Sequence, residues 1–355
     1  MKTIAFVVQL PKYVSPAQRF RCEQYEKLLE AEGYKVDTYP FLDESTYKVL
    51  YKNGYLLKKI TGVFKGFLRR VSFLFRLRKY NYIFLQREMA PIGPPIFEWI
   101  AVKLLKAKII YDFDDAIWIP NVSDGNKLAG YLKCYWKIKW ICRWAYKISV
   151  GNSYLLNFAK QYNKRVIFNP TCVDANRYNL TPNHRNRPVV VGWTGSHSTI
   201  QFLALLFPLL KEIENEKKFR FLVICDRKPK ADLKSMEFIK WNRETEIEDL
   251  AKINIGIMPL PNDTWSEGKC GFKIIQYFSL GIPAIASPVG VNKTIVDHGL
   301  NGYLAANDKE WKARLVELIC NEEKRIQFGI EGRKKVQREY SVESNANNFL
   351  FLFAD

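Results

Sequence analysis

The residues with the clearest chemical meaning lie in the run GKCGFKIIQYFSLG, residues 268–281. A helix is expected to begin near Gly271 and to end at Gly281, with Lys269 just before its first turn and Lys273 inside it. Free backbone N–H groups at a helix N-terminus, the positive end of the helix dipole and two lysines together suit a diphosphate. A surface helix with solvated lysines fits the same residue types equally well.

Two further segments could complete a phosphate site of this kind. Gln276 lies one turn after Lys273 and could hydrogen-bond a ribose hydroxyl. The turn at residues 194–196 stands between an apolar strand and a helix, so it could offer backbone N–H groups. The expected donor-binding residues are Gly195, Ser196, Lys269, Gly271, Phe272, Lys273 and Gln276.

Three carboxylates stand within four residues at Asp112-Phe113-Asp114-Asp115, directly after the apolar residues 109–111. In a parallel sheet this position lies at the carboxyl edge, where ligands bind. Asp112-x-Asp114 has the spacing of a metal-binding DxD motif, which we discount because of the alternation of strands and helices. Capping of the next helix is the structural alternative to a substrate contact. We favour Asp114 and Asp115 as contacts to a transferred sugar or an acceptor hydroxyl, because a cap needs fewer carboxylates.

Three arginines are expected at the same edge of the first sheet. Arg19 and Arg21 flank the start of the first helix, and Arg87 follows the strand expected at residues 82–85. Each could contact an acceptor in a cleft. Equally, Arg21 or Arg87 could pair with a nearby glutamate.

The segment from Ser45 to Arg87 contains no acidic residue and many basic ones. Apolar side chains recur on one helical face at Phe64, Phe67, Leu68, Val71 and Phe75, beside a basic stripe. This pattern is typical of a helix lying in the interface of an anionic membrane, although a helix packed on its own domain with a solvated rim would look similar. The expected membrane contacts are Lys58, Lys65, Arg69, Arg70 and Arg76, whereas Trp136, Trp140 and Trp144 are expected to face the core.

Apolar strands that alternate with longer helices must position all these residues. This alternation runs through residues 4–168 and again through residues 189–286, and it predicts α/β architecture with parallel sheets covered on both faces. A polar, proline-flanked segment at residues 169–188 reads as a linker. We therefore predict two Rossmann-like domains facing a central cleft, residues 1–183 and 184–333, followed by a helical tail at residues 334–355.

Composition narrows the possible partners. The formal net charge of +19 predicts an anionic partner such as phosphate, nucleic acid or lipid headgroups. The seven cysteines form no Cys-x-x-Cys pair and the three histidines are scattered, so no metal site is expected; only His197, beside the expected phosphates, keeps a possible catalytic role. No apolar run reaches the ~18 residues of a membrane span, and the expected compartment is the cytoplasm.

The run GKCGFKIIQYFSLGIPAIASPVGVNKTIVDHGLNGYLA, residues 268–305, resembles the donor-site region of glycosyltransferase family four. In particular it is similar to a subgroup with a GKCGFK-type motif. GWTGSHSTIQFL, NIGIMPLP, IIYDFDDAIW and GNSYLLNFA extend the resemblance. It implies a GT-B fold, retention of anomeric configuration, no metal cofactor and a C-terminal helix that returns to the first domain.

Two departures from the family pattern concern charged residues. At the two positions where the family usually has glutamates, this sequence has Gly268 and Gln276. Glu267 lies one residue before the first of these positions. The family usually has an arginine and a lysine after the strand that opens the donor domain. At about these positions this sequence has Trp193 and Ser198, neither of which is cationic. The two lysines of the 268–281 run are therefore expected to neutralise the diphosphate.

Together these observations predict a retaining glycosyltransferase that uses a nucleoside-diphosphate sugar and a lipid-linked glycan acceptor in cell-surface polysaccharide synthesis, on the inner face of a membrane. Lys273, Asp114 and Asp115 form the expected catalytic set. A GT-B-fold nucleotide-sugar epimerase is the nearer alternative, and it would turn over donor without an acceptor. A basic nucleic-acid or anionic-surface binding protein is the other, but no nucleic-acid motif is identifiable.

Overall fold

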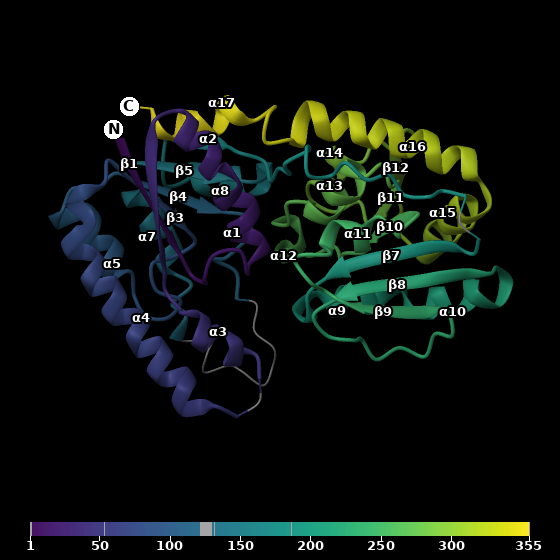
Figure 1. Ribbon diagram of the computed structural model, residues 1–355, viewed down its shortest axis with the longest axis horizontal. Coiled ribbons are helices and arrows are strands. Elements are labelled where there is room, and N and C mark those ends of the chain that lie inside the picture. The colour runs from purple at the N-terminus through teal and green to yellow at the C-terminus, as the bar shows by residue number, and fades with distance from the viewer. Residues whose placement is uncertain (1, 53, 121–129, 131, 186, 355) are drawn as a thin grey trace. The chain divides into compact units, whose positions relative to one another are not determined.

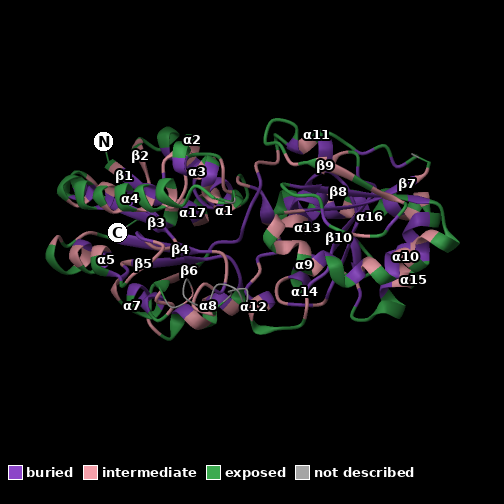
Figure 2. Cartoon of the chain, turned by 90° about the horizontal axis from the view of Figure 1, so that it is seen from below, coloured by how far each residue is buried: buried purple, intermediate pink, exposed green. Residues whose placement is uncertain are grey.

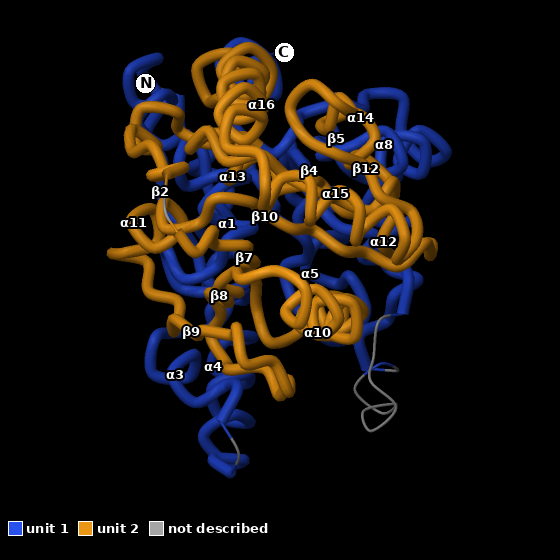
Figure 3. The backbone as a smooth tube through the Cα atoms, turned by 90° about the vertical axis from the view of Figure 1, so that its right-hand side faces the viewer, with its two compact units in different colours: residues 1–171, 346–355 blue, residues 172–345 orange. Residues whose placement is uncertain are grey.

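A computed structural model of the chain describes residues 2–52, 54–120, 130, 132–185 and 187–354. The chain divides into two compact units, residues 1–171 with 346–355, and residues 172–345 (Figures 1 and 3). Each unit contains a six-stranded parallel sheet, which confirms the predicted α/β class with two Rossmann-like domains.

The first sheet has the strand order β2-β1-β3-β4-β5-β6. Its strands are β1 (Lys2–Val8), β2 (Tyr34–Pro40), β3 (Tyr82–Gln86), β4 (Ile109–Phe113), β5 (Lys147–Val150) and β6 (Val166–Phe168). Every residue of β3, β4 and β5 is buried, as expected for central parallel strands that are covered on both faces (Figure 2). The carboxyl ends of β3 and β4 lie side by side, since Gln86 pairs with Asp112.

Helices of the first unit cover this sheet. They are α1 (Pro16–Arg21), α2 (Glu26–Ala31), α3 (Glu44–Leu50), α4 (Leu56–Arg76), α5 (Ile96–Trp99) continued by η3 (Ile100–Leu104), α7 (Lys137–Trp144), α8 (Ser153–Lys160) and α17 (Ala346–Leu350). The inner face of α4 carries Gly62 and Gly66 because a β-carbon there would collide with Thr46 or Phe41. These glycines allow α4 to pack closely on the unit.

The second sheet has the order β12-β11-β10-β7-β8-β9. Its strands are β7 (Val189–Gly195), β8 (Phe219–Cys225), β9 (Met236–Lys240), β10 (Ile255–Met258), β11 (Ala284–Ala286) and β12 (Gly302–Leu304). The helices are α9 (Ile200–Leu203), α10 (Phe207–Glu216), α11 (Glu246–Leu250), α12 (Thr264–Glu267), α13 (Phe272–Ser279), α14 (Asn292–Ile295), α15 (Asp308–Cys320) and α16 (Glu322–Lys335). Helix α13 packs closely on β10, because a β-carbon at Gly256 would collide with the ring of Tyr277.

The unit boundaries differ from the expected 183/184 and 333/334. Val173 forms a bridge with Ser341, and Arg333 donates a hydrogen bond to the carbonyl of Tyr178, so both flanking segments belong to the second unit. The last residues of the chain return to the first unit. There the ring of Phe349 stacks on Tyr25 at 3.8 Å between centroids, and Lys147 Nζ donates to the carbonyls of Phe351 and Ala354.

Candidate functional site

The carboxyl edge of the second sheet collects the expected donor-binding residues. Helix α13 begins after Gly271, whose φ of 66° lies in the left-handed region, and a β-carbon there would collide with Ile295. Only glycine suits both the backbone angle and the space. The helix therefore starts at a fixed place, and its first turn carries Lys273.

Both lysines of the run lie against tryptophan rings. Lys273 Nζ is 5.6 Å from the ring centroid of Trp193, a buried residue of β7, and Lys269 Nζ is 5.1 Å from that of Trp265. Such cation–π contacts hold an ammonium group in place. Two positive charges therefore lie next to the N-terminus of α13, an arrangement that suits a phosphate-bearing ligand.

The end of β7 is connected to α13 by a hydrogen bond. The backbone N of Thr194 donates to Tyr277 Oη at 3.1 Å. Directly after the strand, Ser196 and Thr199 form a capping box at the start of a short 3₁₀ turn. Gly195, the last residue of β7, and Ser196 thus lie where backbone donors were expected, and the backbone N of Ser196 already donates to Thr199 Oγ1 at 3.2 Å.

His197, in the same turn, is paired with Asp226, which follows β8. The Asp226 carboxylate accepts from the backbone N of His197 and contacts its ring Nδ1, each at 2.6 Å. Partial burial would raise the pKa of Asp226, but the hydrogen bonds from His197 lower it below its ordinary value. Asp226 and Tyr277 were not anticipated from the sequence: Asp226 lies outside the recognisable motifs, and Tyr277, although it lies in the 268–281 run, was not singled out as a polar contact.

Gln276 occupies a different environment from the expected ribose contact. Its side chain is buried, with 2% of the residue exposed, and its Nε2 donates to Tyr178 Oη at 3.0 Å. In the structure Gln276 therefore connects α13 to the segment that precedes β7. The side chain that was expected to contact a ribose is thus hydrogen-bonded within the second unit.

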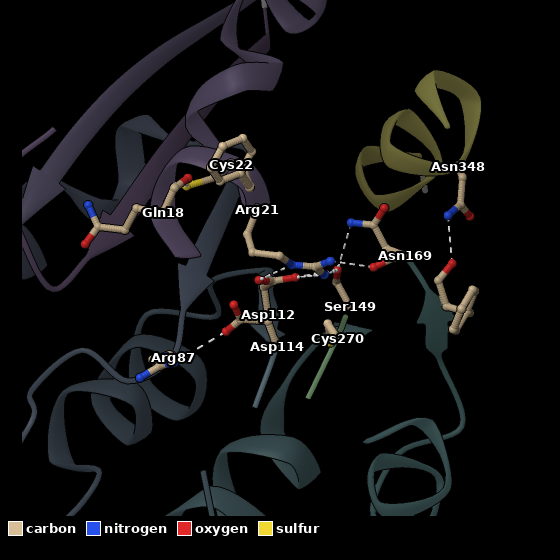
Figure 4. Close-up of polar contacts among 12 residues, drawn as sticks. Gln18, Arg21, Cys22, Arg87, Asp112, Asp114, Ser149, Asn169, Cys270 and Asn348 are labelled. Atoms are coloured by element: carbon tan, nitrogen blue, oxygen red, sulfur yellow. Dashed lines mark hydrogen bonds and ion pairs between the residues drawn. The ribbon is translucent and has the colours of Figure 1, made fainter. Parts of the chain in front are cut away.

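Arg21 lies in a buried polar network of the first unit (Figure 4). Its guanidinium donates to both Asp112 oxygens, at 3.1 and 2.5 Å, and the two side chains are fully buried. Ser149 Oγ donates to the same carboxylate at 2.6 Å, and Arg21 also donates to the carbonyl of Asn169. The prediction that Arg21 contacts an acceptor is corrected, because its donors hold β4, β5 and the end of β6 together.

The other two arginines differ from each other. Arg19 is also buried, with 6% exposed, and its guanidinium lies 4.9 Å from the ring of Phe20. Arg87 remains one-third exposed, and its Nη2 lies 2.8 Å from Asp115 and 3.5 Å from Asp114. Arg87 thus pairs with the carboxylates after β4.

The Arg87–Asp114–Asp115 cluster forms a charged site at the carboxyl edge of the first sheet. Arg87 has a φ of 65°, a strained value for a non-glycine residue, and its backbone N donates to the carbonyl of Asp112. Burial and the neighbouring Asp115 carboxylate raise the pKa of Asp114. Burial alone would lower the pKa of Arg87, but the two carboxylates raise it. The cluster holds two carboxylates in fixed positions.

Helix α4 places the expected membrane residues in two groups. Lys58, Lys65 and Arg76 are exposed. Arg70 is buried, with 1% exposed, and its guanidinium donates to the carbonyls of Val8, Tyr39 and Met89, while burial lowers its pKa to about 9. Arg70 is therefore corrected to a packing residue. Arg69 is half-buried and pairs with Asp43.

The expectation that Trp136, Trp140 and Trp144 face the core is wrong for two of them. Trp136 and Trp140 are 51% and 37% exposed. The inner face of α7 is formed instead by Lys137, Ile138, Ile141 and Cys142. Lys137 can occupy this face because its Nζ donates to the carbonyls of Ala90 and Gly93.

Two classes of feature are missing from the described part of the chain. Its histidines, cysteines and acidic residues do not form a group of three or more that could hold a metal ion. None of its helices is both long and apolar enough to cross a membrane.

Comparisons with known proteins support an assignment for the second unit. Residues 188–321 match the family described as glycosyl transferases group 1. Spore coat protein SA of Bacillus subtilis is 27% identical over 81 residues, and this match spans 22% of either chain. The similarity to glycosyl transferases group 1 thus lies in the second unit.

Solved structures extend the similarity to the fold of the whole chain. Sucrose-phosphate synthase from Thermosynechococcus elongatus superposes with a TM-score of 0.69 at 14% identity, over 99% of this chain and 98% of that one. The Anabaena protein Alr3699/HepE, solved in complex with UDP and glucose, gives a TM-score of 0.66 at 15% identity, over 99% of both chains. The chain thus has the GT-B fold expected from the sequence.

Proposed function

We propose that this chain is a retaining glycosyltransferase that moves a sugar from a nucleoside-diphosphate sugar to a lipid-linked glycan acceptor. The observation that carries the proposal is the start of α13, where Lys269 and Lys273 lie beside the helix N-terminus at the carboxyl edge of the second sheet. The similarity to a protein solved with UDP and glucose supports a nucleotide-sugar donor.

The proposed chemistry is that of a leaving diphosphate. As the bond between the sugar and the diphosphate breaks, negative charge develops on the phosphate oxygens. Lys273, Lys269 and the α13 N-terminus stabilise this charge, with the turn at Gly195 and Ser196 as further donor. The acceptor attacks on the face that the diphosphate leaves, and the leaving phosphate takes the acceptor proton, so the reaction needs neither a covalent glycosyl-enzyme nor a metal.

On the acceptor side, we propose that Asp114 and Asp115 orient the sugar or the acceptor hydroxyl, with Arg87 as a positioning residue. Arg87 holds the Asp115 carboxylate at 2.8 Å, so the position of that carboxylate is fixed before a substrate arrives. Such fixed groups lower the cost of orienting a substrate.

Asp115→Asn is expected to lower turnover by about tenfold or more. The amide pairs more weakly with Arg87, so the side chain at this position orients the acceptor less well. Nucleotide affinity should stay near that of the wild type. Initial rates and nucleotide titrations of the two proteins measure both effects. Asp232→Asn, at a fully exposed carboxylate of the second unit, is the matched control. If Asp115→Asn lost as much nucleotide affinity as turnover, this role would be contradicted.

The lipid-linked acceptor is inferred from the outer face of α4. Six large apolar side chains repeat along it at helical spacing and are exposed, namely Leu57, Ile60, Phe64, Leu68, Val71 and Phe75; we name them the α4 stripe. The exposed Lys58, Lys65 and Arg76 follow beside it. An apolar stripe with a basic border suits the interface of an anionic membrane, and it supports the proposal of a peripheral protein on the inner face of a membrane.

Changing Lys58, Lys65 and Arg76 together to glutamate should release the protein from anionic vesicles. Each lysine or arginine contributes about 1 kcal/mol near such a surface, so the loss of three corresponds to about 100-fold in affinity. Vesicle flotation measures the change, and nucleotide binding should be unaffected. The same reversal at Lys217, Lys218 and Lys309, exposed in the second unit, is the control. Unchanged flotation of the α4 variant would mean that the basic border serves another purpose.

The donor assignment is tested by titrating the protein with nucleosides, nucleoside monophosphates and nucleoside diphosphates of each base. The proposal requires that nucleotides of one base bind the protein. The nucleoside diphosphate of that base should bind more tightly than the monophosphate, because the lysines contact the terminal phosphate. Binding that does not depend on the second phosphate would count against the α13 site.

A further inference from the structure

Apolar side chains are also exposed on α5 with η3, where α5 contacts α4, and around α7, which contacts α5. On α5 and η3 these are Ile96, Trp99 and Leu104; Trp140 lies on α7, and Trp136 directly precedes that helix. We name these five residues the tryptophan face. Large apolar side chains that gather on neighbouring elements mark an interaction surface, whereas isolated ones do not.

The tryptophan face adjoins α4 within the first unit. Phe67 of α4 and Phe97 of α5 have ring centroids 6.0 Å apart, and α5 in turn contacts α7. Figure 1 shows α4 and α5 next to each other. The α4 stripe and the tryptophan face therefore lie on elements that contact one another, α4 with α5 and α5 with α7.

Within α5, η3 and α7, the exposed charged side chains are all basic. Lys103, Lys139 and Arg143 are exposed among its apolar residues. The one acidic residue in α5, η3 and α7 is Glu98, which is buried and accepts from the backbone N of Met89. The guanidinium of Arg143 lies 4.7 Å from the ring of Trp140, so a cation and an aromatic ring share the outer side of α7.

This composition matches a lipid headgroup layer. Tryptophan is enriched at membrane interfaces because its large ring is apolar and its N–H is polar, and basic residues are attracted to anionic headgroups. A net charge of +19 makes an anionic surface the favoured occupant over a second copy of the same chain, since two copies repel each other.

We propose that the tryptophan face inserts into the headgroup region of an anionic bilayer, as a second attachment beside the α4 stripe. The inference rests on the membrane association proposed above and adds to it. If α4 were the single attachment, the bound protein could rotate about the axis of this helix. Two attachments on neighbouring helices fix the orientation of the first unit, and with it the carboxyl edge that carries Asp114 and Asp115.

Tryptophan fluorescence tests this directly. The protein is mixed with vesicles of phosphatidylglycerol and phosphatidylcholine whose acyl chains carry bromine, which quenches nearby tryptophans. The wild type should be quenched. Trp99→Phe/Trp136→Phe/Trp140→Phe should lose most of the quenching, whereas Trp241→Phe, in the second unit, should keep it. Trp136→Ala/Trp140→Ala should lower vesicle affinity about tenfold, because large apolar side chains no longer insert. Circular dichroism and thermal unfolding check that each variant is folded.

The outcomes separate the two proposals. Vesicle binding without quenching in the wild type would overturn the tryptophan face and leave the α4 attachment standing. No vesicle binding at all would overturn both. A dimer in analytical ultracentrifugation that the triple phenylalanine variant abolishes would show that a second copy covers the face, which also overturns the inference.

Discussion

Lys273→Ala is expected to lower turnover about 100-fold or more and to weaken binding of the nucleoside diphosphate. Removing one charged donor to a developing oxyanion costs about 3 kcal/mol of barrier. Lys273 is the lysine inside the first turn of α13, and its contact with Trp193 fixes its direction. Initial rates with a nucleotide sugar, together with calorimetric titration of the diphosphate, measure both consequences.

Controls separate charge from folding in this experiment. Lys273→Arg keeps the positive charge and should retain part of the nucleotide affinity. Lys293→Ala removes an exposed lysine from nearby α14 and should leave both measurements unchanged. If Lys273→Ala bound the diphosphate and turned over as the wild type does, the donor site would lie elsewhere.

Among the substitutions proposed for this protein, those that break the buried Arg21–Asp112 pair should lower the free energy of unfolding most. Removing one partner of a buried ion pair leaves an unpaired charge and typically costs about 3–5 kcal/mol. Here the pair is fully buried, and Ser149 and the carbonyl of Asn169 share its hydrogen bonds. Arg21→Ala should therefore lower the unfolding midpoint in urea sharply, as followed by circular dichroism.

Two variants sharpen the stability experiment. Arg21→Met/Asp112→Leu removes both charges and should recover part of the lost stability. Arg69→Ala breaks the partly exposed pair with Asp43 and should cost about 1 kcal/mol or less. A loss of similar size in Arg21→Ala and Arg69→Ala would mean that the buried network contributes little.

The fold could be predicted from the sequence because its strands are short apolar runs between helices. The alternation expected through residues 4–168 and 189–286 corresponds to the two parallel sheets, but β9 and β12 were not anticipated as strands. Both lie at an edge of the second sheet. Edge strands are covered less completely, and β9 accordingly mixes polar with apolar residues. The helix start at Gly271 was predictable because glycine and the apolar run after it are local signals.

The environment of single side chains was harder to predict. Arg21, Arg70 and Gln276 are polar and lie in or near apparent site motifs, yet each is buried with partners that are distant in the sequence. Residue type cannot tell a buried donor from an exposed one. Helical spacing likewise predicted an apolar face on α7 but not its direction, because Lys137 takes the inner side and the tryptophans the outer one.

The central claim is that a sugar passes from a nucleotide to a lipid-linked acceptor, and sugar transfer measures it most directly. The protein is incubated with a nucleotide sugar labelled in the sugar, and with lipids extracted from membranes. The account predicts that label enters the organic phase, that nucleoside diphosphate is released in equal amount, and that Lys273→Ala abolishes both. Conversion of the nucleotide sugar to an isomer without added lipid, with no label in the organic phase, would identify an epimerase and contradict the account.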